Sequence, residues 1–301
     1  MKLRQLEKKD VPGMLEWMHD EESLEFFRFD TVNTTEEQAC LFVDNSFSIT
    51  DRHYAIVDDA DIYLGTISLK NIDLDKKNAE YAIVLRKNAR GTGVAQFATK
   101  ELLGIAFNEI GLRVIYLNVF VENRRAVSFY EKMGFRDMHK IDDIVTAAGE
   151  KRQIRWYYFP QENYLKCKKC RRLAFDVHGD NRGRLIAVES GKDIPFNIKR
   201  MFYIYGTEGN VIRGCHANKK SSFLFICMNG SVKIDIDDGE NKDSILLKEK
   251  NDALYLPPMT WKEMYDFSDD AVLLVLSDEF YDSNEYIRDY DEFINEVKVS
   301  E

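Results

Sequence analysis

The chain has 301 residues, of which 45% are hydrophobic, and a formal net charge of −10. This length favours two domains of about 150 residues each, and the negative charge argues against non-specific binding to nucleic acid or to an anionic membrane. No apolar run approaches the roughly 20 residues of a membrane-spanning helix. The N-terminal segment MKLRQLEKKDV lacks the apolar core of a signal peptide. We therefore expect a cytoplasmic protein.

The five cysteines do not form the pattern of an extracellular disulfide framework. Cys167 and Cys170 lie in a CKKC motif, which can begin a zinc site. No second CxxC and no paired histidines follow at the spacing of a zinc finger. The sequence therefore predicts no metal.

Helical and strand patterns alternate over residues 1–160, which we expect to form the first domain. A helix should begin near Val11, after an Asp–Val–Pro start. Strands are expected over 53–59, 62–72, 79–85, 113–120 and 153–159, and helices over 93–111 and 123–135. The pattern predicts an α/β domain built on one central sheet flanked by helices.

A glycine-rich turn separates the strand at 79–85 from the helix at 93–111. Glycine lets the backbone approach a ligand closely, and the start of a helix offers unpaired N–H donors to an anion such as a pyrophosphate. A plain loop can produce the same short pattern. The residues of the turn, which are the predicted cofactor contacts, are Arg90, Gly91, Thr92, Gly93, Val94 and Ala95.

The turn resembles the signature of the GCN5-related N-acetyltransferase (GNAT) family, Arg/Gln-x-x-Gly-x-Gly/Ala, filled here by Arg90, Gly93 and Ala95. The family also has a downstream asparagine before a helix that contains a tyrosine and ends in Gly-Phe. That element is matched by Asn123, Tyr130, Gly134 and Phe135. The resemblance covers the whole first half of the chain in the expected order.

This resemblance implies that acetyl-CoA, or another acyl-CoA, binds with its pyrophosphate on the amides of 91–95 and that its acyl group is transferred to an amine. It implies that Asn123 helps to hold the cofactor and that Tyr130 protonates the departing thiolate. Glu80, on the strand before the turn, is our candidate base, although a solvated edge residue would look the same. Glu21 and Glu22 are interpreted as a charge cluster at a helix end.

Residues 161–301 form the second expected domain, and most of their patterns indicate strands. Short strands joined by Gly, Asn and Asp turns fill 171–267, and only 283–297 has a helical pattern. Such regular strand spacing predicts an all-β sandwich or barrel with a short C-terminal helix. The boundary falls in the short polar segment PQENYLK at 160–166.

This half resembles the sugar-nucleotide 3,4-ketoisomerases of the cupin superfamily, including the WxcM-like proteins. The matching segments are 183–206, 213–220, 227–239, 254–282 and 286–293. The resemblance implies a flattened antiparallel barrel that forms a homodimer and needs no catalytic metal. It also implies a substrate, dTDP-4-keto-6-deoxyglucose, whose ketone moves between C4 and C3.

His216 is the candidate base of this isomerisation, because the free pKa of histidine lies near neutral pH. The family reads His-Ala-His-Lys at this point, whereas this chain has Asn218 in place of the second histidine. An amide cannot carry protons as an imidazole does. Phe202 stands where we expect the family to offer a tyrosine hydroxyl. Either His216 isomerises with a substitute donor, or the domain has lost catalysis and keeps sugar-nucleotide binding.

The remaining predicted contacts would bind the nucleotide sugar. Arg200 and Arg213 have the guanidinium geometry that pairs with a diphosphate. Aromatic rings can stack on a base or a sugar, although ordinary packing explains any one of them equally well. The predicted substrate-binding residues are Arg200, Arg213, Tyr205, Asn218, Lys219, Tyr255 and Tyr265.

The two halves together suggest a bifunctional enzyme that makes an N-acylated 3-amino-3,6-dideoxyhexose nucleotide for a cell-surface polysaccharide. One chain would catalyse the steps before and after a separate transamination. Two alternatives stay open at this point. The second domain could be a non-catalytic module that dimerises the chain and binds the sugar nucleotide, or the acyltransferase could act on a protein or peptide amine.

Overall fold

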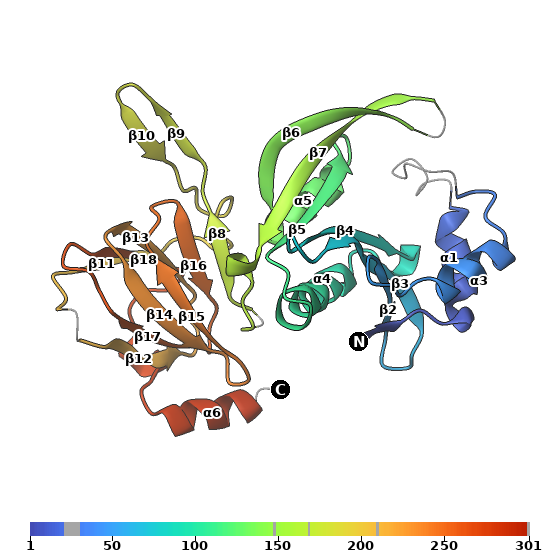
Figure 1. Ribbon diagram of the computed structural model, residues 1–301. Coiled ribbons are helices and arrows are strands. Elements are labelled where there is room, and N and C mark those ends of the chain that lie inside the picture. The colour runs from blue at the N-terminus through green and yellow to red at the C-terminus, as the bar shows by residue number, and fades with distance from the viewer. Residues whose placement is uncertain (21–30, 147–148, 168, 209–210, 300–301) are drawn as a thin grey trace. The chain divides into compact units, whose positions relative to one another are not determined.

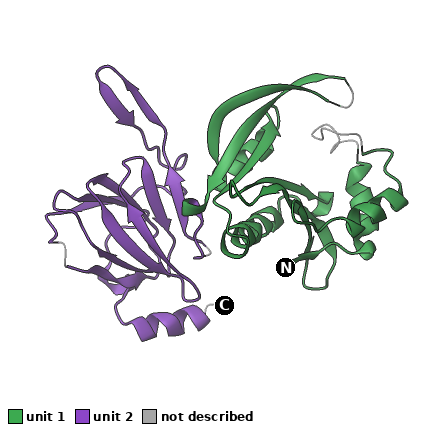
Figure 2. Cartoon of the chain, viewed as in Figure 1, with its two compact units in different colours: residues 1–162 green, residues 163–301 purple. Residues whose placement is uncertain are grey.

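A computed structural model describes residues 1–20, 31–146, 149–167, 169–208 and 211–299. The chain folds into two compact units, Met1–Glu162 and Asn163–Glu301, which are coloured separately in Figure 2. Glu21 and Glu22 lie outside the described residues. No helix in the described ranges is both long and apolar enough to span a membrane.

The first unit is built on one seven-stranded sheet of order β1-β2-β3-β4-β5-β7-β6, which can be followed in Figure 1. All neighbouring strands are antiparallel except β4 and β5, which are parallel. The strands are β1 (Lys2–Gln5), β2 (Arg52–Val57), β3 (Tyr63–Asp73), β4 (Asn78–Leu85), β5 (Val114–Phe120), β6 (Arg136–Val145) and β7 (Lys151–Pro160).

Helices cover both faces of this sheet. They are α1 (Val11–Met18), α3 (Glu36–Asp44), α4 (Val94–Gly104) and α5 (Arg124–Lys132). Val84 of β4 packs against the apolar side chains of α1 and α3. Tyr81 points to the other face, where its hydroxyl lies 2.7 Å from that of Thr99 on α4 and its ring contacts Tyr130 on α5. The expected α/β domain is therefore confirmed, with α1 and α3 on one face and α4 and α5 on the other.

The structure shortens one expected helix and adds two strands and a helix that the sequence did not predict. The helix expected over 93–111 ends at Gly104, and a π-helical turn, η3 (Ile105–Glu109), follows it. Strands β1 and β6 and helix α3 were not expected. The residues of β6 are mostly exposed, so their side chains carry little apolar periodicity. Among the described residues, the 3₁₀ turns η1 (Lys8–Asp10) and η2 (Lys87–Ala89) lie in this unit, and η4 (Gln161–Asn163) spans the boundary between the two units.

The second unit contains two antiparallel five-stranded sheets and a separate hairpin. The first sheet, called the β11 sheet, has the order β11-β18-β13-β16-β8, and the second, called the β12 sheet, has the order β15-β14-β17-β12-β19. The β11 sheet contains β8 (Arg171–Ala174), β11 (Arg200–Tyr205), β13 (Phe223–Asn229), β16 (Asp252–Leu256) and β18 (Val272–Ser277). The β12 sheet contains β12 (Arg213–Asn218), β14 (Val232–Asp237), β15 (Lys242–Leu247), β17 (Trp261–Tyr265) and β19 (Tyr286–Ile287). The hairpin is β9 (Val177–Asp180) with β10 (Gly183–Ile186).

The two sheets pack face to face over one apolar core. Phe225 and Val275 of the β11 sheet and Ile234 and Met264 of the β12 sheet belong to the same buried cluster. We call the sheet faces that meet in this cluster the inner faces. Helix α6 (Tyr290–Val299) covers the outer face of the β12 sheet through Phe293, and η5 (Ser283–Glu285) precedes β19. The all-β unit with a short C-terminal helix is confirmed, although its sheets do not close into one continuous barrel.

Candidate active sites

Strands β4 and β5 separate shortly after they pair. Their parallel register covers only three residue pairs and ends at Glu80 opposite Tyr116. β4 continues to Leu85, and Ile83, Val84 and Leu85 are only partly buried although β4 is a central strand. The two strands therefore diverge toward their C-terminal ends, which leaves one edge of β4 without a partner strand. The glycine turn follows β4 at this end of the sheet, and Asn123 follows β5.

The glycine turn has the backbone geometry of an anion site. Gly91 and Gly93 have φ values of 82° and 91°, where a residue other than glycine would be strained. Gly93 is the N-cap of α4, and no side chain caps the first turn of that helix. A Cβ added to Gly93 would meet no atom within 4 Å, so the space in front of the helix is open. The residues present therefore fit a pyrophosphate held by backbone amides.

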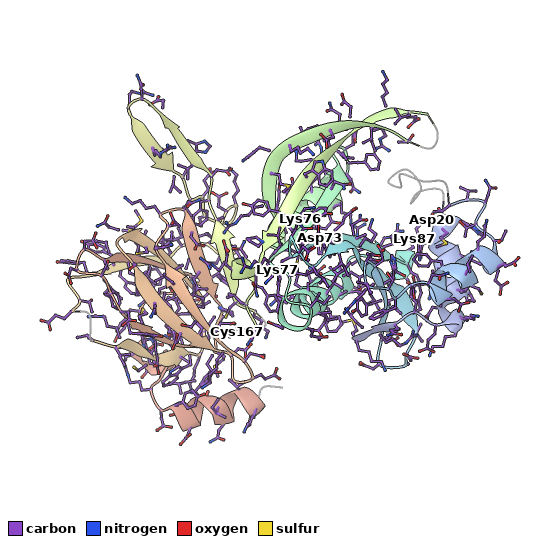
Figure 3. The ribbon with its side chains drawn as sticks, viewed as in Figure 1. Asp20, Asp73, Lys76, Lys77, Lys87 and Cys167 are labelled. Atoms are coloured by element: carbon purple, nitrogen blue, oxygen red, sulfur yellow. The ribbon has the colours of Figure 1, made fainter. Side chains whose placement is uncertain are left out.

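Polar side chains hold this turn in shape. The Thr92 hydroxyl donates to the Ala89 carbonyl oxygen over 2.7 Å. Arg90 donates from Nε to the Leu85 carbonyl oxygen over 3.2 Å, and its Nη2 lies 3.5 Å from Asp20. Figure 3 labels Asp20 at the same end of the sheet as Lys87. Arg90 therefore stabilises the conformation of the turn.

An arginine that the sequence analysis did not select lies beside the turn. Nη2 of Arg125, in the first turn of α5, lies 3.8 Å from the position of a Cβ on Gly91. Its neighbour Asn123 accepts a hydrogen bond from the Ala126 amide over 3.1 Å, so Asn123 caps α5. The cap thereby fixes the start of α5, where Arg125 lies beside the glycine turn.

Tyr130 and Glu80 lie on opposite faces of β4. Tyr130 contacts the ring of Tyr81 with centroids 5.8 Å apart, and burial raises the pKa of the Tyr130 hydroxyl above its usual range. Glu80 is the neighbour of Tyr81 in the strand and therefore points the other way, where it binds Lys70 over 3.1 Å and Asn71 over 3.0 Å. A ligand that contacts both Tyr130 and Glu80 must therefore lie in the opening between β4 and β5.

Asn118 adds an unexpected polar group to this opening. It lies on β5 two residues beyond Tyr116, and therefore on the same sheet face as Glu80. Its Nδ2 is buried and has no hydrogen-bond partner among the described residues. An amide that donates to nothing in the protein is available to an acceptor on a ligand. An asparagine within an apolar strand gave no signal of this role.

A β-bulge brings Arg213 and His216 to the same face of β12. Regular alternation would place residues three apart on opposite faces. The register shifts between Gly214 and His216, so that Arg213 opposes Met264 and His216 opposes Lys262, both on the inner face. Gly214 has φ +91°, and a Cβ there would lie 2.6 Å from the Lys262 carbonyl oxygen. Only glycine fits this position.

The bulge also fixes the tautomer of His216. Nδ1 of His216 lies 2.8 Å from the Gly214 carbonyl oxygen, which can only accept, so Nδ1 carries the proton and Nε2 is left as the acceptor. Burial, together with the nearby charge of Lys262, lowers the pKa of His216 to about 4. The imidazole is therefore neutral at neutral pH and can accept a proton at Nε2.

Asn218 and a buried lysine complete the inner-face cluster. Asn218 is 1% exposed and Lys262 is 3% exposed. Lys262 Nζ donates to Asn218 Oδ1 over 2.7 Å. Burial lowers the pKa of Lys262 to about 7, and Glu285 opposes that shift. The sequence analysis did not select Lys262, because only the strand register places it beside His216.

Aromatic rings connect Arg200 with His216. The Arg200 guanidinium lies 5.5 Å from the ring of Phe202 and 5.6 Å from that of Tyr281. Tyr281 contacts Tyr286 at 5.8 Å, and Tyr286 contacts His216 at 4.8 Å. The rings of Tyr281 and Tyr286 therefore form a chain of contacts from Arg200 to His216.

Arg200 also has spare hydrogen-bonding capacity. Its Nε and Nη2 are buried and have no partner within the ranges that the structure describes. It shares the inner face of β11 with Phe202, because Phe202 opposes the core residue Val275. An unpaired guanidinium at such a place fits an anionic ligand such as a diphosphate.

The other predicted substrate contacts lie away from this cluster. Tyr205 is on the outer face of β11, since its neighbour Ile204 packs into the core, and it is 69% exposed. Tyr255 packs against Phe196 and Arg171 on the outer face of the β11 sheet. Lys219 pairs with Glu296 of α6 over 2.5 Å. Of the residues predicted for this unit, Arg200 thus lies on the inner face of the β11 sheet, and Arg213, His216 and Asn218 lie on the inner face of the β12 sheet.

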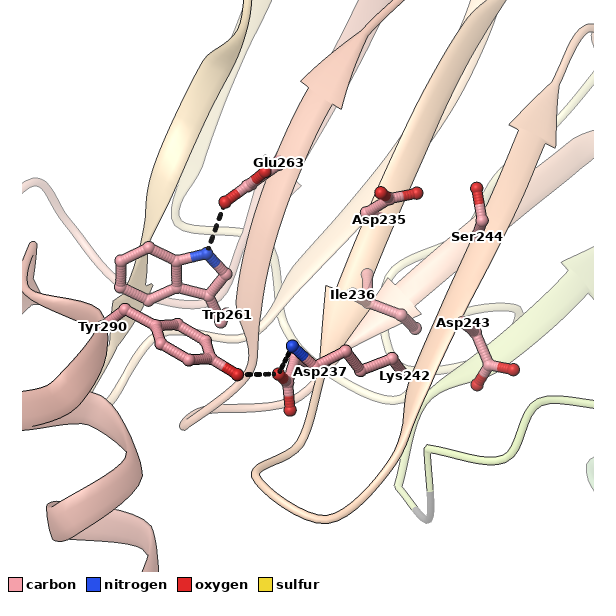
Figure 4. A pocket seen from close by; sticks show the side chains of 9 residues that line it. All are labelled: Asp235, Ile236, Asp237, Lys242, Asp243, Ser244, Trp261, Glu263 and Tyr290. Atoms are coloured by element: carbon pink, nitrogen blue, oxygen red, sulfur yellow. Dashed lines mark hydrogen bonds and ion pairs between the residues drawn. The ribbon is translucent and has the colours of Figure 1, made fainter.

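Tyr265 lies on the outer face of β17, where its hydroxyl donates to Asp235 over 3.1 Å. Asp235 lines a pocket of about 300 Å³ on that face, shown in Figure 4. The acidic groups there have partners: Asp237 accepts from Tyr290 over 2.5 Å, and Glu263 accepts from Trp261 over 3.0 Å. Because it lies on the outer face, this pocket is separate from the His216 cluster.

Two family models match the chain, one for each unit. A model described as "Acetyltransferase (GNAT) domain" matches residues 1–136, and one described as "WxcM-like, C-terminal" matches residues 168–298. The TDP-4-oxo-6-deoxy-alpha-D-glucose-3,4-oxoisomerase of Aneurinibacillus thermoaerophilus is 46% identical over 114 residues. That alignment covers 38% of this chain and 82% of the relative.

The first unit is similar to polyamine acetyltransferases. The spermidine N(1)-acetyltransferase of Vibrio cholerae is 24% identical over 163 residues, which cover 54% of this chain and 94% of the relative. A crystal structure of spermidine N-acetyltransferase from Vibrio cholerae in complex with CoA and spermine matches with a TM-score of 0.50 and 23% identity. The match covers 55% of this chain and 98% of that one, and it confirms the fold of the first unit. The chain is an enzyme that belongs to the WxcM-like family through its second unit and carries a GNAT acetyltransferase domain as its first.

Proposed function

We propose that the chain is a bifunctional nucleotide-sugar enzyme. The second unit isomerises dTDP-4-keto-6-deoxyglucose to its 3-keto form. The first unit transfers an acyl group from acetyl-CoA, or another acyl-CoA, to the amine of the derived dTDP-3-amino-3,6-dideoxyhexose. The observation that carries the proposal is the neutral His216 on the inner face of the β12 sheet, with Nε2 left as an acceptor, together with Arg200 on the inner face of the β11 sheet, whose buried Nε and Nη2 have no partner among the described residues.

The isomerase chemistry follows from this geometry. Nε2 of His216 accepts the proton from C3, next to the C4 ketone, and the electron pair left behind forms the enediol. A proton returned to C4 completes the transfer of the ketone to C3. Arg200 and Arg213 would hold the diphosphate, and Tyr281 and Tyr286 would hydrogen-bond the sugar. Similarity to the Aneurinibacillus oxoisomerase supports the substrate.

The acyltransferase chemistry uses the opening between β4 and β5. Acyl-CoA supplies an activated thioester there, and the amides of Gly93, Val94 and Ala95 with Arg125 would hold its phosphates. Tyr130, kept protonated by its raised pKa, would donate to the departing sulfur. Glu80 would accept a proton from the attacking amine after exchange of its Lys70 and Asn71 contacts for the substrate.

The two reactions are related by chemistry. The 3-ketosugar is the form that a transaminase can convert to a 3-amino sugar, and that amine is what the first unit would acylate. The N-acylated amino sugar would be a building block of a cell-surface polysaccharide. We place the reactions in the cytoplasm, where acyl-CoA and nucleotide sugars are made.

We also propose a homodimer that forms through the second unit. β11 is the edge strand of its sheet, so it has unpaired backbone groups. Its outer face is apolar and exposed, with Met201 at 62%, Tyr203 at 59% and Tyr205 at 69%. Such a face on an open edge is suited to pairing with a second copy of the chain.

Proton NMR of the purified protein with dTDP-4-keto-6-deoxyglucose in D₂O, without acyl-CoA, tests the isomerase. We expect loss of the C3 proton signal and the appearance of a 3-keto product. An unchanged spectrum with line broadening would instead identify a non-catalytic sugar-nucleotide-binding unit.

Release of the CoA thiol in the presence of acetyl-CoA and the dTDP-3-amino sugar tests the acyltransferase. Spermidine and a lysine-containing peptide serve as comparison amines. Faster acetylation of either one would contradict the proposed sugar acceptor.

A further inference from the structure

Lys262 occupies an unfavourable position for a charged group. It is 3% exposed, and its only hydrogen bond among the described residues goes to Asn218 Oδ1. Its other close neighbour is the ring of Phe223, 4.8 Å from Nζ. Within the part of the chain that the structure describes, no carboxylate lies within ion-pair distance of Lys262. An apolar side chain would stabilise such a position better, because a buried charge without a counterion carries a large desolvation penalty.

Lys262 lies directly opposite His216, the proposed isomerase base. Lys262 opposes His216 in the register of β17 and β12, so both side chains share the inner face. Asn218 lies two residues from His216 on the same strand and directs its Oδ1 to Lys262. Its Nδ2 is buried and unpartnered. Three polar groups thus meet, and two of them have donors that no described protein atom accepts.

The surrounding charges agree with a lysine that changes protonation near neutral pH. Glu285 is the acidic group whose charge favours the ammonium form of Lys262, and its carboxylate is already bonded to the amide and hydroxyl of Ser221. On the other strands, His216 is neutral, and Arg288 adds positive charge near His216. Burial dominates and lowers the pKa of Lys262 to about 7. A group with this pKa can both donate and accept protons.

We propose that Lys262 is the second proton-carrying residue of the isomerase site and that Asn218 positions its amine. This inference rests on the proposed isomerase function. While His216 moves the proton from C3 to C4, the Lys262 ammonium donates a proton to O4 as the C4 ketone becomes an enol. The resulting amine then accepts the proton from the O3 hydroxyl as the C3 ketone forms. Protons balance, no oxidant is needed, and Lys262 returns to its starting state.

The same assignment accounts for Asn218. An asparagine in place of a second histidine removes one proton carrier from β12, while the lysine on the neighbouring strand supplies another. Asn218 then acts as a hydrogen-bond acceptor for the lysine, and its free Nδ2 can donate to a sugar oxygen. The departure from the His-Ala-His-Lys pattern is thereby compensated across the strand pair.

The test compares Lys262→Met with Lys233→Met, a matched control on the neighbouring strand β14 whose exposed lysine pairs with Asp266 over 2.8 Å. The full chain is assayed with dTDP-4-keto-6-deoxyglucose, and dTDP binding is measured in parallel. We expect Lys262→Met to lower kcat about 100-fold or more with dTDP affinity preserved. The pH profile of kcat/KM should lose its fall above pH 7. Lys233→Met should match the unmodified protein.

A second variant keeps the proposal testable if Lys262→Met does not fold. Asn218→Ala removes the acceptor of the ammonium and should lower the pH at which kcat/KM falls by about one unit. Conversion by Lys262→Met within threefold of the unmodified protein, with the basic limb unchanged, would overturn the role of Lys262 alone. No conversion by the unmodified protein would overturn the proposed isomerase, and the role of Lys262 with it.

Discussion

The two candidate sites are built from different parts of the chain. In the first unit, the candidate site is made mostly of backbone: two glycines with positive φ and a helix start without a side-chain cap form a turn that fits an anion. In the second unit, the candidate site consists of buried side chains: the charge of Lys262 lowers the pKa of His216, and Asn218 accepts a hydrogen bond from Lys262. A backbone site is sensitive to changes in chain conformation. A side-chain site is sensitive to changes in a single titrating group.

The largest expected effect tests the side-chain site. His216→Asn removes the group proposed to accept the C3 proton, so exchange of that proton with D₂O should fall at least 1,000-fold. Acyl transfer by the same preparation should be unchanged, because the first unit keeps its own site. His178→Asn, in the exposed hairpin, is the control. Undiminished proton exchange in His216→Asn would remove His216 from the base role.

Tyr130→Phe tests whether the first unit also needs one titrating side chain. Loss of the proton donor to sulfur should lower kcat for acyl transfer about 100-fold, with little change in KM for acyl-CoA. Tyr54→Phe, which alters another buried tyrosine on β2, is the control. If kcat for acyl transfer were the same in Tyr130→Phe and in the unmodified protein, solvent would protonate the thiolate and the site would not need a titrating side chain. Glu80→Gln removes the proposed base of the acyltransferase. It should lower kcat for acyl transfer about tenfold and leave the rate of isomerisation unchanged.

Gly93→Ala tests the backbone site directly. The added Cβ meets no atom within 4 Å, so any loss must come from the strain of a positive φ. We expect KM for acyl-CoA to rise about tenfold while kcat at saturation changes little. Gly111→Ala, at a positive φ in a loop remote from the turn in sequence, is the matched control for strain. An equal rise in both variants would show a general loss of stability rather than a loss of phosphate binding.

The smallest effect concerns stability. The folded pKa of Lys262, about 7, lies below its unfolded value of 10.5, so the unfolded chain binds more protons between these pH values. The free energy of unfolding of the second unit should therefore rise with pH from 7 to 10.5. Lys262→Met should lack this slope and be about 1–4 kcal/mol more stable at pH 6. Denaturant titrations at several pH values measure the free energy of unfolding of the unmodified protein and of Lys262→Met. The same pH dependence in both proteins would contradict the lowered pKa of the buried Lys262.

Local patterns and strand register explain what the sequence could and could not predict. The glycine turn and the asparagine before the helix at 123–135 are short contiguous motifs whose conformation is set by their own residues, so the sequence could locate both, although it did not predict that Asn123 caps the helix. Lys262 reaches His216 only because β17 pairs with β12 in one register. Tyr286 reaches it through β19, which pairs with β12 over two residue pairs. Contacts of this kind depend on the three-dimensional pairing of distant segments, which no local period encodes.

The predicted aromatic contacts show the same limit from the opposite side. Tyr205, Tyr255 and Tyr265 were selected for their ring chemistry, but alternation places each on an outer face. The face of a strand that is buried can be read only once its partners are known, since both sheets of this unit have apolar residues on either side. Strand β11 illustrates this, with Ile204 packed into the core and Met201 exposed at 62%.

The bulge in β12 also bears on how this segment can vary in length. Gly214 and Cys215 together occupy the place of one residue in the ladder, so Cys215 is in effect an inserted residue. A chain that lacks Cys215 would keep Arg213 and His216 on one face through plain alternation. Gly214→Val keeps the length but forbids the bulge, and it would turn Arg213 away from His216. At this point of the fold, a deletion is the conservative change and a substitution is the disruptive one.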